Sequence, residues 1–258
     1  MPAAVLKGRV ALVTGVSRRK GIGFAIAQQL AMLGADVCIH SFTPYDAERE
    51  WGADADGIPA LIATLEEYGT QIAHAEGDFL DPAVPEQIVN TAVKTFGHVD
   101  ILVANHVYST MGNLEEMTAS EIDLHLLINV RGTLLLAQSF AAQHHKSAGG
   151  RIILLTSGQQ LAPMPGELAY VASKGALQQL TLSLSTHLIP RGITVNTVNP
   201  GATDTGWANA ELYELIRAAN PQERWGKPED AARLIGWLAT DDAQWITGQT
   251  INSNGGGY

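Results

Sequence analysis

The sequence has one cysteine, few basic residues and no long apolar run. Cys38 is the only cysteine, so no disulfide bond can form within the chain, and the apolar stretch around it predicts a buried strand residue. No apolar run reaches the ~18 residues that a membrane-spanning helix needs. The N-terminus also lacks the basic segment, apolar stretch and cleavage site of a secretory signal. These absences predict a cytoplasmic protein with no membrane partner.

Lysine and arginine are scarce relative to acidic residues. The 258 residues include 16 Lys and Arg against 26 Asp and Glu, which gives a formal net charge of −10. Nucleic acids bind basic surfaces, so we expect no nucleic-acid partner. No set of cysteine, histidine and acidic residues has the spacing of a metal site, and we expect none. The adjacent His144 and His145 are interpreted as surface residues near a helix end.

Short apolar runs alternate with longer helical patterns along the whole chain. The apolar runs lie at residues 9–15, 35–41, 71–78, 99–105, 150–157, 192–200 and 249–256, and the helical patterns at 21–34, 57–69, 82–97, 118–146, 168–189 and 228–240. This alternation predicts an α/β fold: one Rossmann-fold domain over residues 1–258, with a doubly wound parallel sheet of about seven strands and helices on both faces.

Two long irregular segments interrupt the alternation, at residues 42–56 and at about 202–225. Each follows a predicted strand, and long loops at the carboxyl ends of parallel strands are where ligands bind. We expect the second segment to form a lid over a substrate.

A glycine-rich loop follows the first apolar run, in the stretch TGVSRRKGIG of residues 14–23. It joins a predicted strand to a predicted helix, an arrangement that presents free backbone N–H groups and the helix dipole to an anion. We expect the loop to hold the pyrophosphate of a dinucleotide. The residues of this cofactor site are Gly15, Ser17, Gly21, Ile22 and Gly23.

The end of the second apolar run indicates which dinucleotide binds. An NAD site usually has an acidic residue there, whereas this chain has Ser41. A carboxylate would repel a 2′-phosphate, and the consecutive cations Arg18, Arg19 and Lys20 would attract one. We therefore predict a preference for NADP(H), with NAD(H) as the alternative cofactor. The other interpretation of the three cations is a solvated charge run without a ligand.

Further polar residues follow the third and fourth apolar runs. Asp78, next to Phe79, can accept a hydrogen bond from the adenine amino group. Asn105 ends the fourth run and faces the adenosine side of the predicted cofactor site. We assign all three residues to cofactor binding.

A candidate catalytic set lies around the predicted helix 168–189. Tyr170 and Lys174 are four residues apart and share one face of that helix. An ammonium beside a phenol favours the phenolate, so we expect the pKa of Tyr170 to fall below its ordinary value of about 10. Such a tyrosine can serve as general acid in carbonyl reduction and as general base in alcohol oxidation. Ser157 can hydrogen-bond the substrate oxygen as charge develops there.

These motifs resemble those of the short-chain dehydrogenase/reductase family in its single-domain form of about 250 residues. The family's Tyr-x-x-x-Lys matches YVASK, and its serine thirteen residues before the tyrosine matches Ser157. The resemblance implies that Asn129 holds a water in a proton relay and that Asp78 binds the cofactor. It also implies that the turn Pro200–Gly201, with the following Thr203 and Thr205, holds the nicotinamide carboxamide. A homo-oligomer, dimer or tetramer, is implied as well.

The sequence departs from the family pattern at two places. Five residues separate Gly15 from Gly21, where the common form of the family has three. The family's Asn-Asn-Ala-Gly is replaced by Ala104–Val107, of which only Asn105 matches. His106 is therefore either a determinant of the pocket's shape and polarity or a packed loop residue without a chemical role.

The resemblance implies an NADP(H)-dependent oxidoreductase that interconverts a small-molecule carbonyl and a secondary alcohol, similar to 3-oxoacyl-thioester reductases. Enoyl-thioester reduction is the alternative reaction, because that branch also has a long glycine loop. Its tyrosine, however, lies seven residues before the lysine, where this chain has Glu167. A non-catalytic NADP(H)-binding regulator is the alternative from another class, and a pure binder would need neither Ser157 nor Tyr170.

Overall fold

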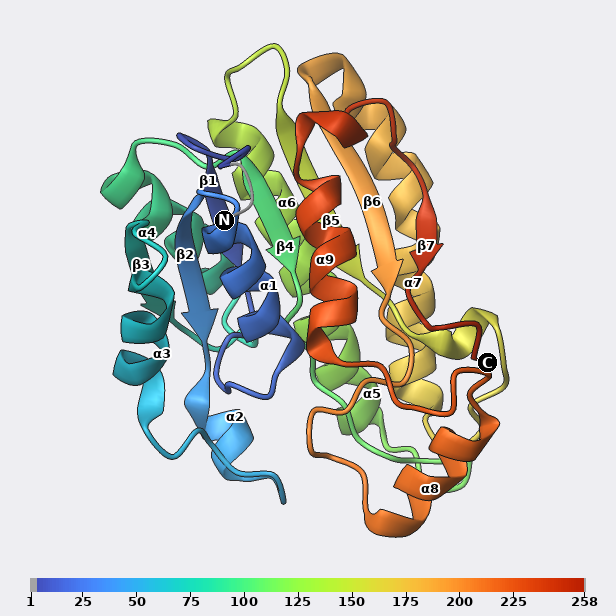
Figure 1. The fold of residues 1–258 in the computed structure, drawn as a ribbon. Coiled ribbons are helices and arrows are strands. Elements are labelled where there is room, and N and C mark those ends of the chain that lie inside the picture. The colour runs from blue at the N-terminus through green and yellow to red at the C-terminus, as the bar shows by residue number, and fades with distance from the viewer. Residues whose placement is uncertain (1–3, 258) are drawn as a thin grey trace.

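A computed structural model describes residues 4–257 and centres on a seven-stranded parallel sheet (Figure 1). Its spatial order is β3–β2–β1–β4–β5–β6–β7, and every neighbouring pair is parallel. The strands are Val10–Val13 (β1), Asp36–Ser41 (β2), Ile72–Glu76 (β3), Ile101–Ala104 (β4), Gly150–Leu155 (β5), Ile193–Asn199 (β6) and Thr250–Asn252 (β7). The predicted doubly wound sheet is confirmed.

Long helices cover both faces of the sheet. One face carries α1 (Ile22–Met32), α3 (Gly57–Glu66) and α9 (Pro228–Leu238), and the other carries α4 (Val84–Phe96), α6 (Gly132–Gln143) and α7 (Leu168–Leu188). Three further helices, α2 (Thr43–Ala47), α5 (Ala119–His125) and α8 (Ala210–Ala219), lie at the lower edge in Figure 1, near the carboxyl ends of the strands. The segments that can form a binding site therefore gather at one edge.

Each central strand contributes to two apolar cores. In β1, Ala11 and Val13 pack in the core under α1 and α9, whereas Val10 and Leu12 pack in the core under α4 and α6. Successive side chains of a strand point to opposite faces, and helices cover both faces here, so all four residues are buried. This double coverage explains why the strands are continuous apolar runs in the sequence.

The structure refines several predicted elements. The pattern at 118–146 forms three pieces, because a π-helical stretch, Leu126–Arg131, joins α5 to α6. The irregular segment 42–56 contains the short helix α2, and the predicted lid contains α8. The surface interpretation is wrong for His144, which is buried and stacks on Phe140 with ring centres 5.9 Å apart. This packing follows because α6 ends at Gln143 and His144 turns toward the core.

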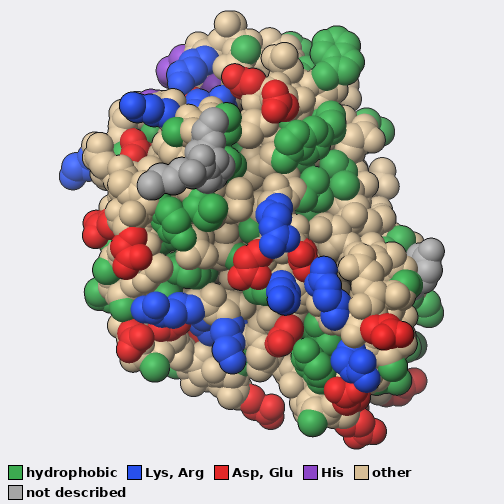
Figure 2. Space-filling view, viewed as in Figure 1, with side chains coloured by type: hydrophobic (Ala, Val, Ile, Leu, Met, Phe, Trp, Pro, Cys, Tyr) green, Lys and Arg blue, Asp and Glu red, His purple; other side chains and the backbone are tan. Residues whose placement is uncertain are grey.

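The structure also bears on four expectations from composition, which concern the single cysteine, membrane-spanning helices, metal-binding side chains and surface charge. Cys38 is buried in β2, as predicted, and burial raises its pKa to about 12. Among residues 4–257, no helix is long and apolar enough to cross a membrane. The same residues contain no group of three or more side chains placed to hold a metal ion. Basic and acidic side chains are mixed over the lower half of the face in Figure 2.

The chain order places a topological switch point between β1 and β4, and the space beyond the carboxyl ends of these two strands is called the crevice below. From β1 the chain builds outward to β3, then returns to place β4 on the other side of β1. Ligands of doubly wound sheets bind at such a switch point, beyond the carboxyl ends of the strands. The glycine loop follows β1 and Asn105 follows β4, so both lie at this crevice.

Candidate active site

Two glycines of the loop lie so close to neighbouring atoms that no residue with a side chain can replace them. Gly15 has φ of +73°, and a Cβ there would lie 2.9 Å from the His106 Cα. A Cβ on Gly23 would lie 2.3 Å from the Gly15 carbonyl oxygen. Gly21 precedes α1 and provides no side-chain cap, so the first N–H groups of that helix remain free for an anion. The loop fits the pyrophosphate cradle that the sequence predicts.

Asn105 ties the end of β4 to the glycine loop. Its side-chain Nδ2 donates to the carbonyl oxygens of Thr14 and Gly15, at 3.0 and 3.1 Å. Its backbone N–H donates to the Thr14 hydroxyl at 3.1 Å. Asn105 therefore shapes the crevice by holding two of its walls together, and its side-chain donors face the loop backbone.

His106 is a buried and fully engaged residue of the same turn. Its Nε2 donates to the Ile128 carbonyl at 3.1 Å, so its Nδ1 accepts from the Thr14 hydroxyl at 2.8 Å. The ring stacks on Phe79 with centres 3.8 Å apart. Burial holds the pKa of His106 well below its ordinary value, which keeps the imidazole neutral. These contacts support the interpretation of His106 as a packed loop residue.

Tyr170 and Lys174 meet Ser157 at the carboxyl end of β5. The Lys174 Nζ lies 5.8 Å from the centre of the Tyr170 ring and donates to the Leu155 carbonyl oxygen at 2.9 Å. Burial lowers the pKa of Lys174 to about 8. The residues of the predicted catalytic set thus occupy one place, with a buried amine next to a phenol.

The predicted lowering of the Tyr170 pKa is wrong. Burial of the hydroxyl among protein atoms raises that pKa to about 12, although the residue as a whole is partly exposed. A hydrogen bond with Ser157 acts in the lowering direction, and the charge of Glu167 raises the pKa further. Burial outweighs the expected cationic effect because the Lys174 ammonium bonds the Leu155 carbonyl rather than the phenol.

Asn129 is buried at the π-helical stretch between α5 and α6. Its Oδ1 accepts from the Tyr108 backbone N–H at 2.7 Å, and its Nδ2 donates to the Tyr108 carbonyl and the Ser173 hydroxyl, both at 2.9 Å. The side chain therefore joins the loop after β4 to α7, beside Lys174. π-Helical insertions are frequent at functional sites, where they redirect a side chain or a carbonyl.

The cations of the glycine loop have partners that the sequence did not reveal. Arg18 pairs with Asp46 at 3.4 Å and donates to the Thr205 carbonyl at 2.9 Å, across the crevice. Arg19 contacts the carboxylates of Asp54 and Asp56, at 3.6 and 3.5 Å. All three acids belong to the segment 42–56. Lys20 is exposed, and residues 4–257 give it no ion pair.

Ser41, Asp78 and Phe79 lie on the β2–β3 side of the crevice. The Ser41 hydroxyl is buried and shares a hydrogen bond of 2.8 Å with His74 Nε2, so its side chain is turned to β3. Asp78 accepts from the Leu80 N–H at 2.9 Å through one oxygen. The Phe79 ring is buried against His106. Of the three, Asp78 is placed best for contact with a ligand.

The turn after β6 supports the base of the lid. Gly201 has φ of +68°, and a Cβ there would lie 2.6 Å from the Asn254 Cβ. The Thr203 hydroxyl bonds the Pro200 and Gly201 carbonyls, both at 3.2 Å, and closes the turn. Thr205 contributes its carbonyl to Arg18. The predicted Pro-Gly segment thus forms one rim of the crevice.

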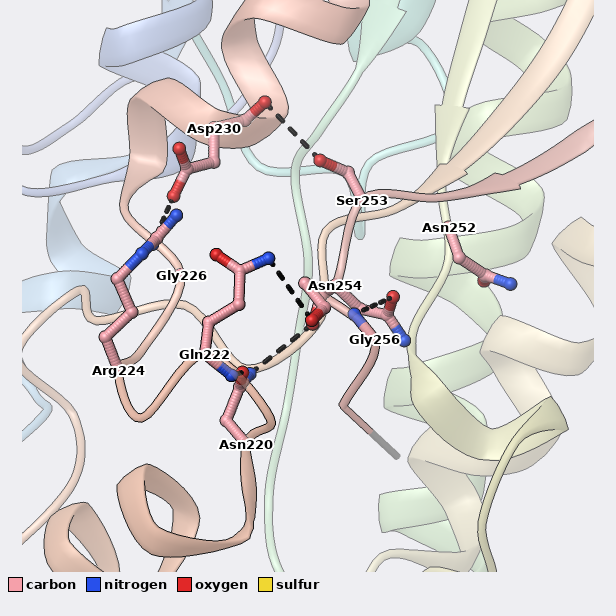
Figure 3. Close-up of a pocket in the computed structure, with 10 residues that line it drawn as sticks. Asn220, Gln222, Arg224, Gly226, Asp230, Asn252, Ser253, Asn254 and Gly256 are labelled. Carbon is pink, nitrogen blue, oxygen red and sulfur yellow. Dashed lines mark hydrogen bonds and ion pairs between the residues drawn. The ribbon is translucent and has the colours of Figure 1, made fainter.

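The segment predicted to form a lid, at about residues 202–225, is held at two places. Trp225 is buried, and Tyr213 and Trp207 pack on it with ring centres 5.1 and 5.7 Å away. Beyond it, the end of the lid meets the C-terminal tail in a polar cavity of about 330 Å³ (Figure 3). There Asn220 donates to the Asn254 carbonyl at 3.4 Å. The polar groups that line this cavity bind one another, so it is a junction between lid and tail.

A second group of residues around Tyr170 was missed from the sequence. Tyr108 lies on the loop after β4 and His125 lies on α5. The ring centres of Tyr108 and His125 are 4.9 Å apart, and those of His125 and Tyr170 are 6.5 Å apart. Tyr45 and Arg49 reach the same place from the segment 42–56. No local motif marks these residues, because tertiary packing alone brings them together.

Known proteins are similar to this chain over nearly its whole length. A family model described as enoyl-(acyl carrier protein) reductase matches residues 15–257. The uncharacterized oxidoreductase YjdA of Bacillus subtilis is 40% identical over 250 residues, 96% of each chain. The human dehydrogenase/reductase SDR family member 4 is 33% identical and covers 97% of this chain and 88% of its own length.

Solved structures are also similar to this chain over nearly its whole length. A short chain dehydrogenase from Burkholderia cenocepacia in complex with NADP has a TM-score of 0.87 at 34% identity, over 97% of this chain and 98% of its own. A blue fluorescent protein from a metagenomic library, in complex with NADPH, has the same TM-score, identity and coverage.

Proposed function

The chain belongs to the short-chain dehydrogenase/reductase family, and from this membership we propose an NADP(H)-dependent oxidoreductase that interconverts a carbonyl compound and a secondary alcohol. The observation that carries the proposal is the meeting of Ser157, Tyr170 and Lys174 at the carboxyl edge of the sheet. A protein that only binds a nucleotide needs no such set.

The three residues have distinct roles in the proposed reaction. Tyr170 donates its phenolic proton to the carbonyl oxygen, and Ser157 donates a hydrogen bond to the same oxygen. With a pKa of about 12, Tyr170 is protonated at neutral pH and therefore holds the proton that carbonyl reduction consumes. The Lys174 cation favours the phenolate that remains after the proton has moved. Reduction at neutral pH therefore starts from the protonated tyrosine.

The crevice fits a dinucleotide. Gly15 and Gly23 leave space that a Cβ would fill, and the uncapped N-terminus of α1 provides N–H groups for a pyrophosphate. When bound, the nicotinamide supplies the hydride that the carbonyl carbon receives. Asp78 and the turn Pro200–Gly201 would hold its adenosine and nicotinamide ends.

A preference for NADP(H) is part of the proposal. No acid stands at the end of β2, and two similar solved structures carry NADP or NADPH. A 2′-phosphate would compete with Asp54 and Asp56 for Arg19, whereas Lys20 is exposed and has no such competitor among the described residues. Lys20 is therefore the cation that a 2′-phosphate can bind without first breaking an ion pair.

Reduction of an enoyl thioester is the second candidate, favoured by the long glycine loop and by the description of the matching family model. The tyrosine position of that reaction holds Glu167, whose pKa is raised by burial and which precedes α7. A carboxyl group at this place does not replace a phenol, so we rank carbonyl reduction first.

A screen of cofactor consumption separates the candidates. Ketones, quinones, sugars, 3-oxoacyl thioesters and enoyl thioesters are offered with NADPH and with NADH. We expect consumption with a carbonyl substrate, and a higher kcat/KM with NADPH than with NADH. Consumption with enoyl thioesters alone would transfer the assignment to the second candidate.

A further inference from the structure

Arg49 is a cation in the site without a carboxylate partner. Arg18 and Arg19 are each paired with acids of the segment 42–56. Residues 4–257 place no carboxylate oxygen within 4.0 Å of the Arg49 guanidinium. Its Nε is buried and finds no hydrogen-bond acceptor among the same residues. A buried donor without a partner, on a charge that no carboxylate neutralises, is a candidate contact for an anionic ligand.

Two tyrosine rings hold this cation in place. The Arg49 Cζ lies 4.5 Å from the centre of the Tyr45 ring and 5.4 Å from that of Tyr108. Burial raises the pKa of both phenols, and the hydrogen bonds and the charge of Arg49 act on them in the opposite direction. The rings attract the guanidinium through cation–π contacts but carry no negative charge that could neutralise it. The side chain is thus preorganised and still available to an anion.

The two rings belong to the wall of the catalytic site. The Tyr45 hydroxyl donates to the Ser109 carbonyl at 3.3 Å and accepts from the Ser109 N–H at 3.2 Å, which fixes α2 on the loop after β4. Tyr45 is close enough to Tyr170 to raise its pKa. The His125 ring lies next to both the Tyr108 ring and the Tyr170 ring. Arg49 therefore stands one layer of aromatic rings away from the proposed proton donor.

The other charged side chains of this wall already form hydrogen bonds or act on Tyr170. Glu121 accepts hydrogen bonds from the Tyr108 hydroxyl at 3.2 Å and from the Thr110 hydroxyl at 2.7 Å. Glu167 acts on Tyr170, and the Lys174 ammonium bonds the Leu155 carbonyl. The two acids repel an anion near Tyr170, so Arg49 is the group of this wall that can attract one.

We propose that Arg49 binds the carboxylate of the substrate, so that the preferred class is oxo acids and the corresponding hydroxy acids. The inference rests on the proposed function and narrows it. A guanidinium offers a planar fork of donors that matches a carboxylate, and charge-assisted bonds of this kind are among the strongest in proteins. The cofactor's 2′-phosphate is the other available anion, but the aromatic rings around Arg49 lead to Tyr170, where the substrate carbonyl reacts.

Paired substrates test this role. Oxo acids and their methyl esters of equal chain length are compared with NADPH, in the wild type and in Arg49→Gln. We expect the wild type to prefer the acid, and the acid-to-ester ratio of kcat/KM to fall about tenfold or more in the variant. The NADPH-to-NADH ratio should not change. Arg49→Lys, which keeps the charge, should retain part of the preference, and the control Lys94→Gln on α4 should retain all of it.

Two outcomes of the kinetic comparison would overturn the proposal. One is an unchanged acid-to-ester ratio in a folded Arg49→Gln protein. The other is a fall in the NADPH-to-NADH ratio that is equal for all substrates, which would put Arg49 at the cofactor. Calorimetric binding of the acid and the ester to the NADPH-loaded protein needs no turnover. It therefore tests Arg49 even if the proposed reaction fails, and equal binding of acid and ester by the wild type would also contradict the role.

Discussion

At the level of single residues, Lys174 carries a charge that the fold buries. Only 3% of the residue is exposed, and burial lowers its pKa to about 8. A buried ammonium reduces the stability of the folded chain, because water solvates it better than protein does. The proposed reaction explains why such a residue is present, since it uses a cation beside Tyr170. Stability and function therefore oppose each other at this position.

This opposition predicts a dependence of stability on pH. The pKa of Lys174 is 10.5 in an exposed chain and about 8 in the fold, so between these values the unfolded chain binds a proton that the folded chain lacks. The free energy of unfolding contributed by Lys174 therefore rises with pH across that interval. Relative to Lys174→Met, the wild type should gain up to about 3 kcal/mol between about pH 7 and about pH 10.

Denaturant unfolding at both pH values measures this difference. Lys94→Met, which removes an exposed lysine from α4, is the control and should show no comparable gain. Parallel stabilities of wild type and Lys174→Met at the two pH values would show that Lys174 keeps an ordinary pKa in the fold.

At the level of elements, the glycine loop and the segment 42–56 differ in how much the sequence reveals. The loop was predicted because its glycines are a local pattern between a strand and a helix. The ion pairs of Arg18 and Arg19 were not, because their acidic partners lie in a segment without periodicity. Helix α2 was missed because its five residues are too few to show helical spacing. The π-helical stretch depends on contacts of Asn129 that only the fold creates.

Two matched glycine substitutions test the close packing of the loop. Gly23→Ala places a Cβ 2.3 Å from the Gly15 carbonyl oxygen, a backbone atom that cannot move freely. We expect a loss of about 1–3 kcal/mol in the free energy of unfolding and weaker binding of NADPH.

Gly175→Ala makes the same change on α7, where a Cβ meets nothing within 4 Å. There alanine should stabilise the helix by up to about 1 kcal/mol. Opposite signs for the two variants in thermal unfolding are the expected result, and equal signs would argue against the close approach at Gly23.

At the level of the whole molecule, more of the sheet than of the site could be predicted from the sequence. Alternating strands and helices indicate a doubly wound sheet because parallel strands need crossover connections. The proposed catalytic pair, Tyr170 and Lys174, could be predicted from its spacing on α7. The Tyr170 pKa was predicted in the wrong direction, since burial depends on the complete fold and outweighed the local pair. Arg49, Tyr108 and His125 could not be found, because their proximity arises between distant segments.

Large apolar side chains that lie exposed on the surface lead to a prediction about assembly. Trp245 is 95% exposed, and Trp237 on α9 and Leu182 on α7 are also exposed. Large apolar side chains at the surface favour association, so we propose that they lie in a contact between copies of the chain. Trp245→Asp should lower the mass measured by light scattering relative to the wild type. A monomeric wild type, or a variant of unchanged mass, would contradict this proposal.

Replacement of Tyr170 by phenylalanine tests the proposed chemistry most directly. The change removes the phenolic O–H and keeps the ring that packs near His125. We predict that kcat for NADPH-dependent carbonyl reduction falls about a hundredfold or more, while the Kd for NADPH stays close to that of the wild type. A Tyr170→Phe protein that reduces the same carbonyl substrate at the wild-type rate would contradict the assignment of Tyr170 as the proton donor.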